Sequence, residues 1–334
     1  MAASSSIVPV VSVLPWRVRA TVIVVLAAAV FSLPLFANNY ILHVLNYSLI
    51  FLLPALGLNL IFGYTGLLSL AQGAFFGLGA YASALVVLHF SWPFWLSFLF
   101  GGLFTACLAL LLGVPALRLR AYSFVMATLG FVFIAETVAK NWVTLTRGDM
   151  ALSGIARPML SLWGPGPVVS GVQNYFYLLA IIAALAVGFF AWLVSSPAGR
   201  CLRAIRDEET LAESQGIPVK AYKMAAFALS GFFAGLGGAA YASYETVVSP
   251  QIFQLYYTLL FLIIVFAGGA GTIAGVFLGT LVFVAIPEML RIAPALRMLL
   301  YGFVFLFFVF FLPNGIGPAL SHWAARKGWW RGRS

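Results

Sequence analysis

The sequence predicts an all-α, polytopic membrane protein with about ten transmembrane helices and both termini in the cytoplasm. Hydrophobic residues make up 63% of the 334 residues, whereas charged residues make up only 8%. Soluble domains carry about 25% charged residues, so this chain has too few to build a water-facing surface. Its apolar runs are continuous and long enough for helices that cross a bilayer, whereas membrane β-barrel strands alternate apolar and polar residues.

Five apolar runs precede residue 144, each bounded by residues that break a helix or prefer water. The first follows Arg17 and Arg19. We expect it to remain as a span, because its run of about 18 apolar residues exceeds the usual h-region of a cleaved signal peptide. The fourth ends before Arg118 and Arg120. The predicted spans are 20–37, 41–62, 66–88, 94–115 and 121–143.

The second half begins with a Gly- and Pro-rich loop at 144–172, and its count of spans depends on charge. Residues 252–287 are either one over-long helix or two short helices that break at Gly268–Thr272. Cytoplasmic segments carry an excess of Lys and Arg, and only the two-helix alternative puts the basic C-terminal tail on the same side as Arg17. The same bias explains the formal net charge of +10, so we expect no nucleic-acid partner. The other predicted spans are 174–194, 224–244 and 297–313.

The most polar part of the chain is the loop at 199–223, which holds four of the eight acidic residues and five of the 18 basic residues. Arg200–Gln215 has helical composition, and Gly216 followed by Pro218 is a stop signal. One interpretation is an interfacial helix that rests on lipid. The acids argue against it, because cytoplasmic leaflets are anionic. We therefore expect a short helix that docks onto a protein partner.

Polar residues also gather in and beside the second and third predicted spans. At membrane depth such side chains usually face a neighbouring helix or a water-filled path. They are therefore candidates for a translocation pathway. However, Gly73 and Gly77 form a small-xxx-small pattern that lets helices approach closely, so tight packing alone is an equally good explanation of this segment. The candidate pathway residues are Asn46, Asn59, Thr65, Ser69 and Gln72.

Motifs for catalysis, metal binding and nucleotide binding are missing from the sequence. There is no GxxxxGK[ST] motif, and the two Cys and three His have no metal-ligand spacing. Glu136 and Lys140 form a favourable i,i+4 pair, but Glu136, Glu245 and Glu288 all lie near predicted outer ends of spans. An ion-coupled carrier would bury acids near mid-membrane. The energy for transport must therefore come from another subunit, or the protein is a passive channel.

Three passages resemble the membrane permease subunits of ABC importers for branched-chain amino acids. The first is GYTGLLSLAQGAFFGLGAYASALV at 63–86, and the third is FAGGAGTIAGVFLGT at 266–280. The second and most specific is GRCLRAIRDEETLAESQGIPVKAYKMAAFALSGFFAGLGGAAYA at 199–242, with Ser-Pro at 249–250. In the family, a loop with Glu-Ala-Ala followed three residues later by Gly forms a short helix that docks into a groove of a cytoplasmic ATPase.

The match to that loop is partial. Gly216 matches the Gly and Ala212 the second Ala. Leu211 and Thr210 stand where Ala and Glu are expected, and Glu209 lies one place early. The resemblance implies that the loop contacts the ATPase, and the candidate coupling residues are Arg200, Arg203, Arg206, Glu209, Ala212, Glu213 and Gly216.

The resemblance further implies one transmembrane permease domain, 20–313, with its coupling loop at 196–223. A cytoplasmic segment at 1–19 precedes it and a basic cytoplasmic tail at 314–334 follows it. The chain would be a transport subunit without a cofactor of its own, in a bacterial inner membrane. ATP and magnesium would bind to partner ATPase subunits, and a second permease subunit and a periplasmic solute-binding protein would complete the importer.

The expected solutes are branched-chain or other small neutral amino acids. Urea or short amides, which similar permeases carry, are an alternative. A stand-alone channel or secondary carrier is the alternative from a different class, and the charged loop at 199–223 argues against it because such a protein would not need one.

Overall fold

The computed structural model describes residues 34, 38–90, 92–155, 157, 171–289, 302 and 315, and it is mostly helical. Among these residues, six helices are long and apolar enough to cross a membrane, and two shorter apolar helices follow them. The helical membrane class is therefore confirmed. The predicted spans 20–37 and 297–313 lie almost wholly outside the described residues, as do both termini. The total of ten spans and the cytoplasmic termini stay predictions.

The six long helices agree with the six predicted spans between 41 and 244, most within five residues at either end. The third begins later than the predicted residue 66, because Gly66 has a left-handed backbone with φ +73° and the segment up to Ala71 is not regular helix. The helices are α2 (Asn39–Leu58), which continues as the π-helical segment η2 (Asn59–Tyr64), α3 (Gln72–Phe90), α4 (Phe94–Ala116), α5 (Ala121–Asn141), α7 (Val172–Ser195) and α10 (Val219–Glu245).

The apolar stretch at 252–287 forms two short helices, as the charge distribution predicts. They are α11 (Leu255–Gly268) and α12 (Ile273–Met289). Between them Gly269 and Gly271 have φ values of +104° and +85°, which glycine adopts without strain. With 14 residues, α11 is about 21 Å long, shorter than the hydrocarbon core of about 30 Å.

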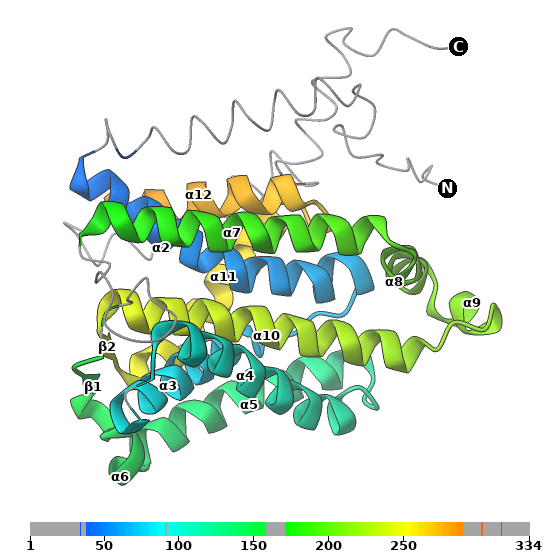
Figure 1. The fold of residues 1–334 in the computed structure, drawn as a ribbon. Helices are drawn as coiled ribbons and strands as arrows, with labels where there is room; N and C mark the ends of the chain where they lie inside the picture. Colours follow the sequence, from blue (N-terminus) through cyan, green and yellow to red (C-terminus); the bar gives the residue numbers. More distant parts are fainter. Residues whose placement is uncertain are drawn as a thin grey trace, which may run out of the picture.

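Small elements cover the end of the bundle opposite the charged loop (Figure 1). The sequence predicts only a loop at 144–172, but the described part of it contains two single-turn helices and a strand. This strand pairs antiparallel with a second one after α10, with Leu152 opposite Val248. The elements are α6 (Val143–Thr146), η3 (Gly148–Met150), β1 (Leu152–Ser153), β2 (Val247–Val248) and η4 (Pro250–Phe253).

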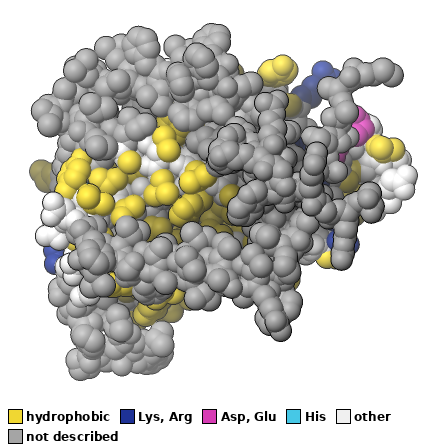
Figure 2. All heavy atoms as spheres, turned by 90° about the horizontal axis from the view of Figure 1, so that it is seen from above, with side chains coloured by type: hydrophobic (Ala, Val, Ile, Leu, Met, Phe, Trp, Pro, Cys, Tyr) yellow, Lys and Arg dark blue, Asp and Glu magenta, His cyan; other side chains and the backbone are white. Residues whose placement is uncertain are grey.

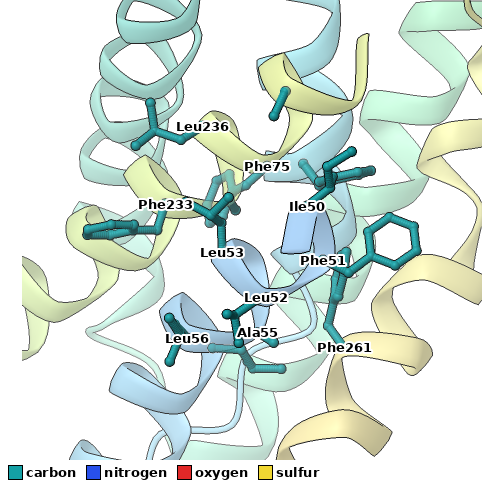
Figure 3. Packing of buried hydrophobic residues seen from close by; sticks show 14 of the residues in the cluster. Ile50, Phe51, Leu52, Leu53, Ala55, Leu56, Phe75, Phe233, Leu236 and Phe261 are labelled. Carbon is teal, nitrogen blue, oxygen red and sulfur yellow. The ribbon is translucent and has the colours of Figure 1, made fainter. Parts of the chain in front are cut away.

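The core of the bundle is built around α10, which packs against α2, α3 and α4. Buried side chains of α2, such as Ile50 and Leu53, meet Phe75, Phe233 and Leu236 from α3 and α10 (Figure 3). The helices approach so closely that some glycines leave no space for a methyl group. A Cβ at position 235 of α10 would lie 2.6 Å from the carbonyl oxygen of Gly101 on α4.

The small-xxx-small pattern in α3 has a packing role in this fold. The amide of Gly73 donates to the Thr258 hydroxyl at 3.2 Å, and a Cβ at position 77 would lie 2.5 Å from the ring of Phe253. The two glycines therefore let α3 approach α11 and η4 closely.

Candidate functional site

The charged loop forms two short helices, α8 (Pro197–Asp207) and α9 (Glu209–Ser214). They extend from one end of the bundle, and α8 lies across the direction of α7 and α10 (Figure 1). We call them the α8–α9 unit. A space-filling view from above shows Lys, Arg, Asp and Glu side chains at this same end (Figure 2).

The expectation of one continuous helix over 200–215 is wrong in two respects. The helix begins earlier, because Pro197 occupies the first turn, where proline is tolerated, and the Ser196 side chain accepts a bond from the Gly199 amide at 3.4 Å. It also breaks at Glu208, which has an extended backbone. Acids are unfavourable at a helix C-terminus and favourable at an N-terminus. The break therefore places Glu208 and Glu209 at the start of α9.

Gly216 ends α9 in the way the sequence predicts. Its φ is +81°, its amide donates to the carbonyl of Glu213 at 3.0 Å, and the amide of Ile217 donates to the carbonyl of Ala212 at 3.1 Å. This pair of bonds is a Schellman motif, and the accompanying apolar contact between Ile217 and Ala212 is also present. The exit of the chain toward α10 is therefore set by local backbone bonds.

The α8–α9 unit has a small apolar core of its own. Ile205, Ala212 and Val219 are each less than 5% exposed and pack together, while Leu202 is buried against the main core. Of the candidate coupling residues, Ala212 is therefore an internal contact. The others are exposed: Arg200, Arg203, Arg206, Glu209, Glu213 and Gly216.

Among the described residues, three charged side chains of the unit bond to other helices. Glu209 forms an ion pair of 2.5 Å with Lys223 at the start of α10. Arg203 donates to the carbonyl oxygen of Val194 at 2.7 Å, near the C-terminus of α7. Arg206 donates to the carbonyl oxygen of Gly63 in η2. The sequence alone predicts none of these contacts. Each depends on where a different helix lies relative to the unit.

The candidate pathway residues at the charged end of α2 and α3 are buried and hydrogen-bonded. The Gln72 amide donates to the carbonyl of Pro54 at 2.7 Å and accepts from the Ser230 hydroxyl at 2.9 Å. The carboxamide oxygen of Asn59 accepts from the Gly271 amide at 2.8 Å. Gln72 thus binds a carbonyl beside the proline in α2, and Asn59 joins η2 to the turn between α11 and α12.

The remaining candidates lie apart from these two. Thr65 donates to the carbonyl of Ile61, and Ser69 accepts from the amide of Ala71. Asn46 is fully buried about 20 Å along α2 from Asn59. The structure does not bring the five residues together at one point, and their role in a pathway stays a prediction.

Asn46 belongs to a polar cluster at the other end of the bundle that the sequence did not predict. Its amide donates to the carbonyl of Val172 at 3.1 Å and to the Tyr244 hydroxyl at 3.4 Å. The same hydroxyl lies 2.5 Å from Nδ1 of His43, and Tyr47 donates to Glu245. The residues come from α2, α7 and α10, so only the packing of the helices reveals the cluster.

Within the described part of the chain, the ionic side chains at the two ends of the bundle do not form a metal site. Among the described residues, no three His, Cys, Asp or Glu side chains are close enough to hold one. The predicted Glu136–Lys140 pair is present at 2.7 Å. What distinguishes the charged end is its set of exposed ionic side chains on short helices, an arrangement suited to contact with another protein.

Comparison with known proteins gives a consistent result. Residues 40–309 match the family described as branched-chain amino acid transport system / permease component. The chain is 29% identical over 304 residues to the high-affinity branched-chain amino acid transport system permease protein LivM of Escherichia coli, covering 85% of this chain and 72% of that protein. The LivM protein of Salmonella typhimurium matches with the same identity and coverage.

A relative that matches a shorter part of the chain is named for a different solute. The chain is 32% identical over 152 residues to the nucleoside ABC transporter permease protein NupC of Lactococcus lactis, which covers 44% of this chain and 48% of that protein. No solved structure matches the chain.

Proposed function

The chain belongs to the family of branched-chain amino acid transport system permease components, and from this premise we propose that it is the membrane-spanning subunit of an ATP-driven importer. It would pair with a second, similar permease subunit and with two cytoplasmic ATPase subunits in a bacterial inner membrane. A periplasmic binding protein would deliver the solute to it. The chain itself would bind neither ATP nor magnesium.

The observation that carries this proposal is the α8–α9 unit. It presents exposed charges of both signs at one end of an otherwise apolar bundle, beside a buried core that fixes its shape. Exposed charges set orientation and partner choice more than raw affinity. A channel or carrier that acts alone has no need for such a unit, whereas a subunit that depends on an ATPase must have one.

We propose branched-chain or other small neutral amino acids as the solutes. The proposal follows the names of the LivM relatives, which match most of the chain. Urea and short amides remain the alternative from the sequence, and nucleosides are added by the name of NupC. Intramembrane charge is scarce in the described spans, and a neutral or zwitterionic solute suits such an interior.

The test is ATP-driven uptake in proteoliposomes that contain the complete importer. Leucine, isoleucine, valine, alanine, urea, acetamide and uridine are supplied in turn with the binding protein, and uptake is measured with and without ATP inside. We expect ATP-dependent uptake of the branched-chain amino acids. Uptake by this chain alone, without ATPase subunits, would contradict the importer proposal. ATP-dependent uptake of another solute would change only the assignment of the substrate.

A further inference from the structure

Three segments that are far apart in the sequence meet at the charged end of the bundle. They are the C-terminal turn of α8, the π-helical segment η2 and the turn between α11 and α12. Arg206 of α8 donates from Nη1 to the carbonyl oxygen of Gly63 in η2. At position 271 in the turn, a Cβ would lie 2.8 Å from the same Nη1 and 3.1 Å from the same carbonyl oxygen.

The second bond at this junction comes from Asn59. Its side chain is 1% exposed, and its oxygen accepts from the Gly271 amide at 2.8 Å. It therefore joins η2 to the turn, while Arg206 joins η2 to α8. Gly63 must be a glycine here, because a Cβ at that position would overlap the Asn59 oxygen and the Gly271 amide. The three segments are thus connected by two hydrogen bonds and by backbones in direct contact.

The bond from Arg206 is also electrostatically favourable. Carbonyl groups at the C-terminal end of a helix carry partial negative charge, and Gly63 lies at that end of α2 and η2. Neither ion pair found among the described residues includes Arg206. Its charge is therefore directed toward the membrane domain, although the side chain as a whole is exposed.

We propose that Arg206 is a positioning residue that transmits movement of α8 to η2 and to the turn between α11 and α12. This inference rests on the proposed function, in which the α8–α9 unit contacts the ATPase. It gives Arg206 a role different from that of exposed charges such as Arg200 and Glu213, which bond to no other helix among the described residues and are free to meet the partner. Movement of the two irregular segments would then change the packing of α2, α11 and α12, which contact one another.

The main variant is Arg206→Gln, and its matched control is Arg200→Gln, which removes the same charge from the same helix. Among the described residues, the Arg200 side chain makes no hydrogen bond or ion pair. Both variants are tested in the complete importer, by co-purification of the ATPase subunits, by ATP hydrolysis and by uptake of the transported solute. For Arg206→Gln we expect normal co-purification and a fall of about fivefold or more in solute transported per ATP, the lower end of typical coupling between sites. Arg200→Gln removes an exposed charge of the proposed docking surface, so it should instead lower co-purification of the ATPase subunits and leave hydrogen exchange at 269–272 unchanged.

A second variant, Gly271→Ala, disturbs the same junction without changing charge. We expect Gly271→Ala and Arg206→Gln to be non-additive in their effect on transport per ATP, because they break one connected contact. Gly271→Ala and Arg200→Gln should be additive. In the purified complex, hydrogen exchange at 269–272 should be faster in Arg206→Gln than in Arg200→Gln. This measurement also applies if the Arg206 variant assembles in low yield.

The outcomes separate this inference from the proposed function. If the wild-type importer shows no ATP-dependent uptake, the proposed function fails. If the wild type transports but Arg206→Gln keeps the wild-type ratio of transport to ATP hydrolysis, only the role of Arg206 is refuted. Loss of ATPase co-purification in Arg206→Gln, with unchanged exchange at 269–272, would also refute it, because Arg206 would then act at the surface that binds the ATPase.

Discussion

Glycine is needed both at the centre of the bundle and in the α8–α9 unit, but for different physical reasons. At the centre, Gly235 of α10 lies so close to α4 that an added Cβ would overlap the Thr105 hydroxyl. At Gly216, which follows α9, no atom of the described residues lies within 4 Å of the Cβ position, and the φ of +81° is what excludes most other residues. Lack of space excludes a side chain at Gly235, whereas backbone conformation excludes most side chains at Gly216.

This difference separates the two regions in mechanical terms. The helices at the centre are held by close backbone contact over several turns, so they should move together. The α8–α9 unit has a small core and a few polar bonds, and it can be altered without repacking the centre. Substitutions in the two regions should therefore affect different measurements, stability in the first and coupled transport in the second.

The largest effect is expected from Gly235→Val at the centre. The two added branches have no space between α10 and α4, and overpacking of this kind typically costs about 1–3 kcal/mol, occasionally more. We place this variant at the upper end, about 3 kcal/mol, because the contacts are with backbone and with a buried hydroxyl. Thermal unfolding of the detergent-purified protein measures the loss.

Gly188→Ala on α7 is the control for Gly235→Val, because no atom of the described residues lies within 4 Å of the Cβ position of Gly188. It should leave the midpoint of unfolding unchanged or raise it, since Ala favours helix over Gly by about 1 kcal/mol. If Gly235→Val unfolds at the same temperature as Gly188→Ala, close packing at the centre is not what requires glycine.

The next largest effect is expected from Gly216→Val, which tests the exit from α9. The left-handed backbone costs a residue with a Cβ roughly 1–2 kcal/mol, so the exit from α9 should shift while the centre stays intact. We expect ATP-driven uptake to fall sharply, with a smaller fall in the midpoint of unfolding than in Gly235→Val and unchanged affinity of the binding protein for solute. Gly216→Asn is the control, because Asn is also found at this position of helix ends. Equal uptake by the Val and Asn variants would show that the exit geometry does not matter.

The sequence predicts most of the long helices, because their apolar runs end at clear signals. The span predicted at 94–115 is α4 (Phe94–Ala116), bounded by Pro93 and the basic residues after Leu117. The break at Gly269–Thr272 was also predictable, because several glycines within a few residues disfavour a helix interior. Local composition was therefore sufficient at both ends of α4 and at the turn between α11 and α12.

Features that depend on contacts between helices were not predictable in this way. The π-helical segment η2 has no composition signal, and Asn59 stabilises it by bonding to Gly271, which is 212 positions away. The strand pair between Leu152 and Val248 is too short to show a period of two. The run of acids at 207–209 was a signal for the break at Glu208. The reason for the break becomes clear only when the helix dipoles of α8 and α9 are considered together.

A smaller effect is expected from Ser230→Ala, which returns to the centre. The variant removes the bond to Gln72 and leaves a buried carboxamide oxygen without that donor. Hydrogen bonds between membrane helices contribute about 0.6 kcal/mol on average and up to about 1.7, so we expect a loss of about 1 kcal/mol. Ser83→Ala is the control, because the Ser83 hydroxyl bonds only to Ala80 of its own helix.

The Ser230 variant also tests the predicted pathway. If Gln72 only joins helices, Ser230→Ala lowers the midpoint of unfolding and leaves the KM of uptake unchanged. A changed KM with normal stability would mean that Gln72 contacts the solute.

The smallest effect is expected at the ion pair between Glu209 and Lys223. The Glu209 side chain is 54% exposed and that of Lys223 is 13% exposed. Pairs at the surface contribute about 0.2–1 kcal/mol, so Glu209→Gln should lower stability by less than about 1 kcal/mol. Charge reversal, Glu209→Lys, should also weaken ATPase association, and more strongly at low salt because surface charges are screened. The double variant with Lys223→Glu restores the pair in reverse. We expect it to recover stability but not association, because the ATPase would still meet a charge of the wrong sign. Recovery of both would mean that Glu209 acts only within the chain and that the docking surface lies on the remaining exposed charges of α8 and α9.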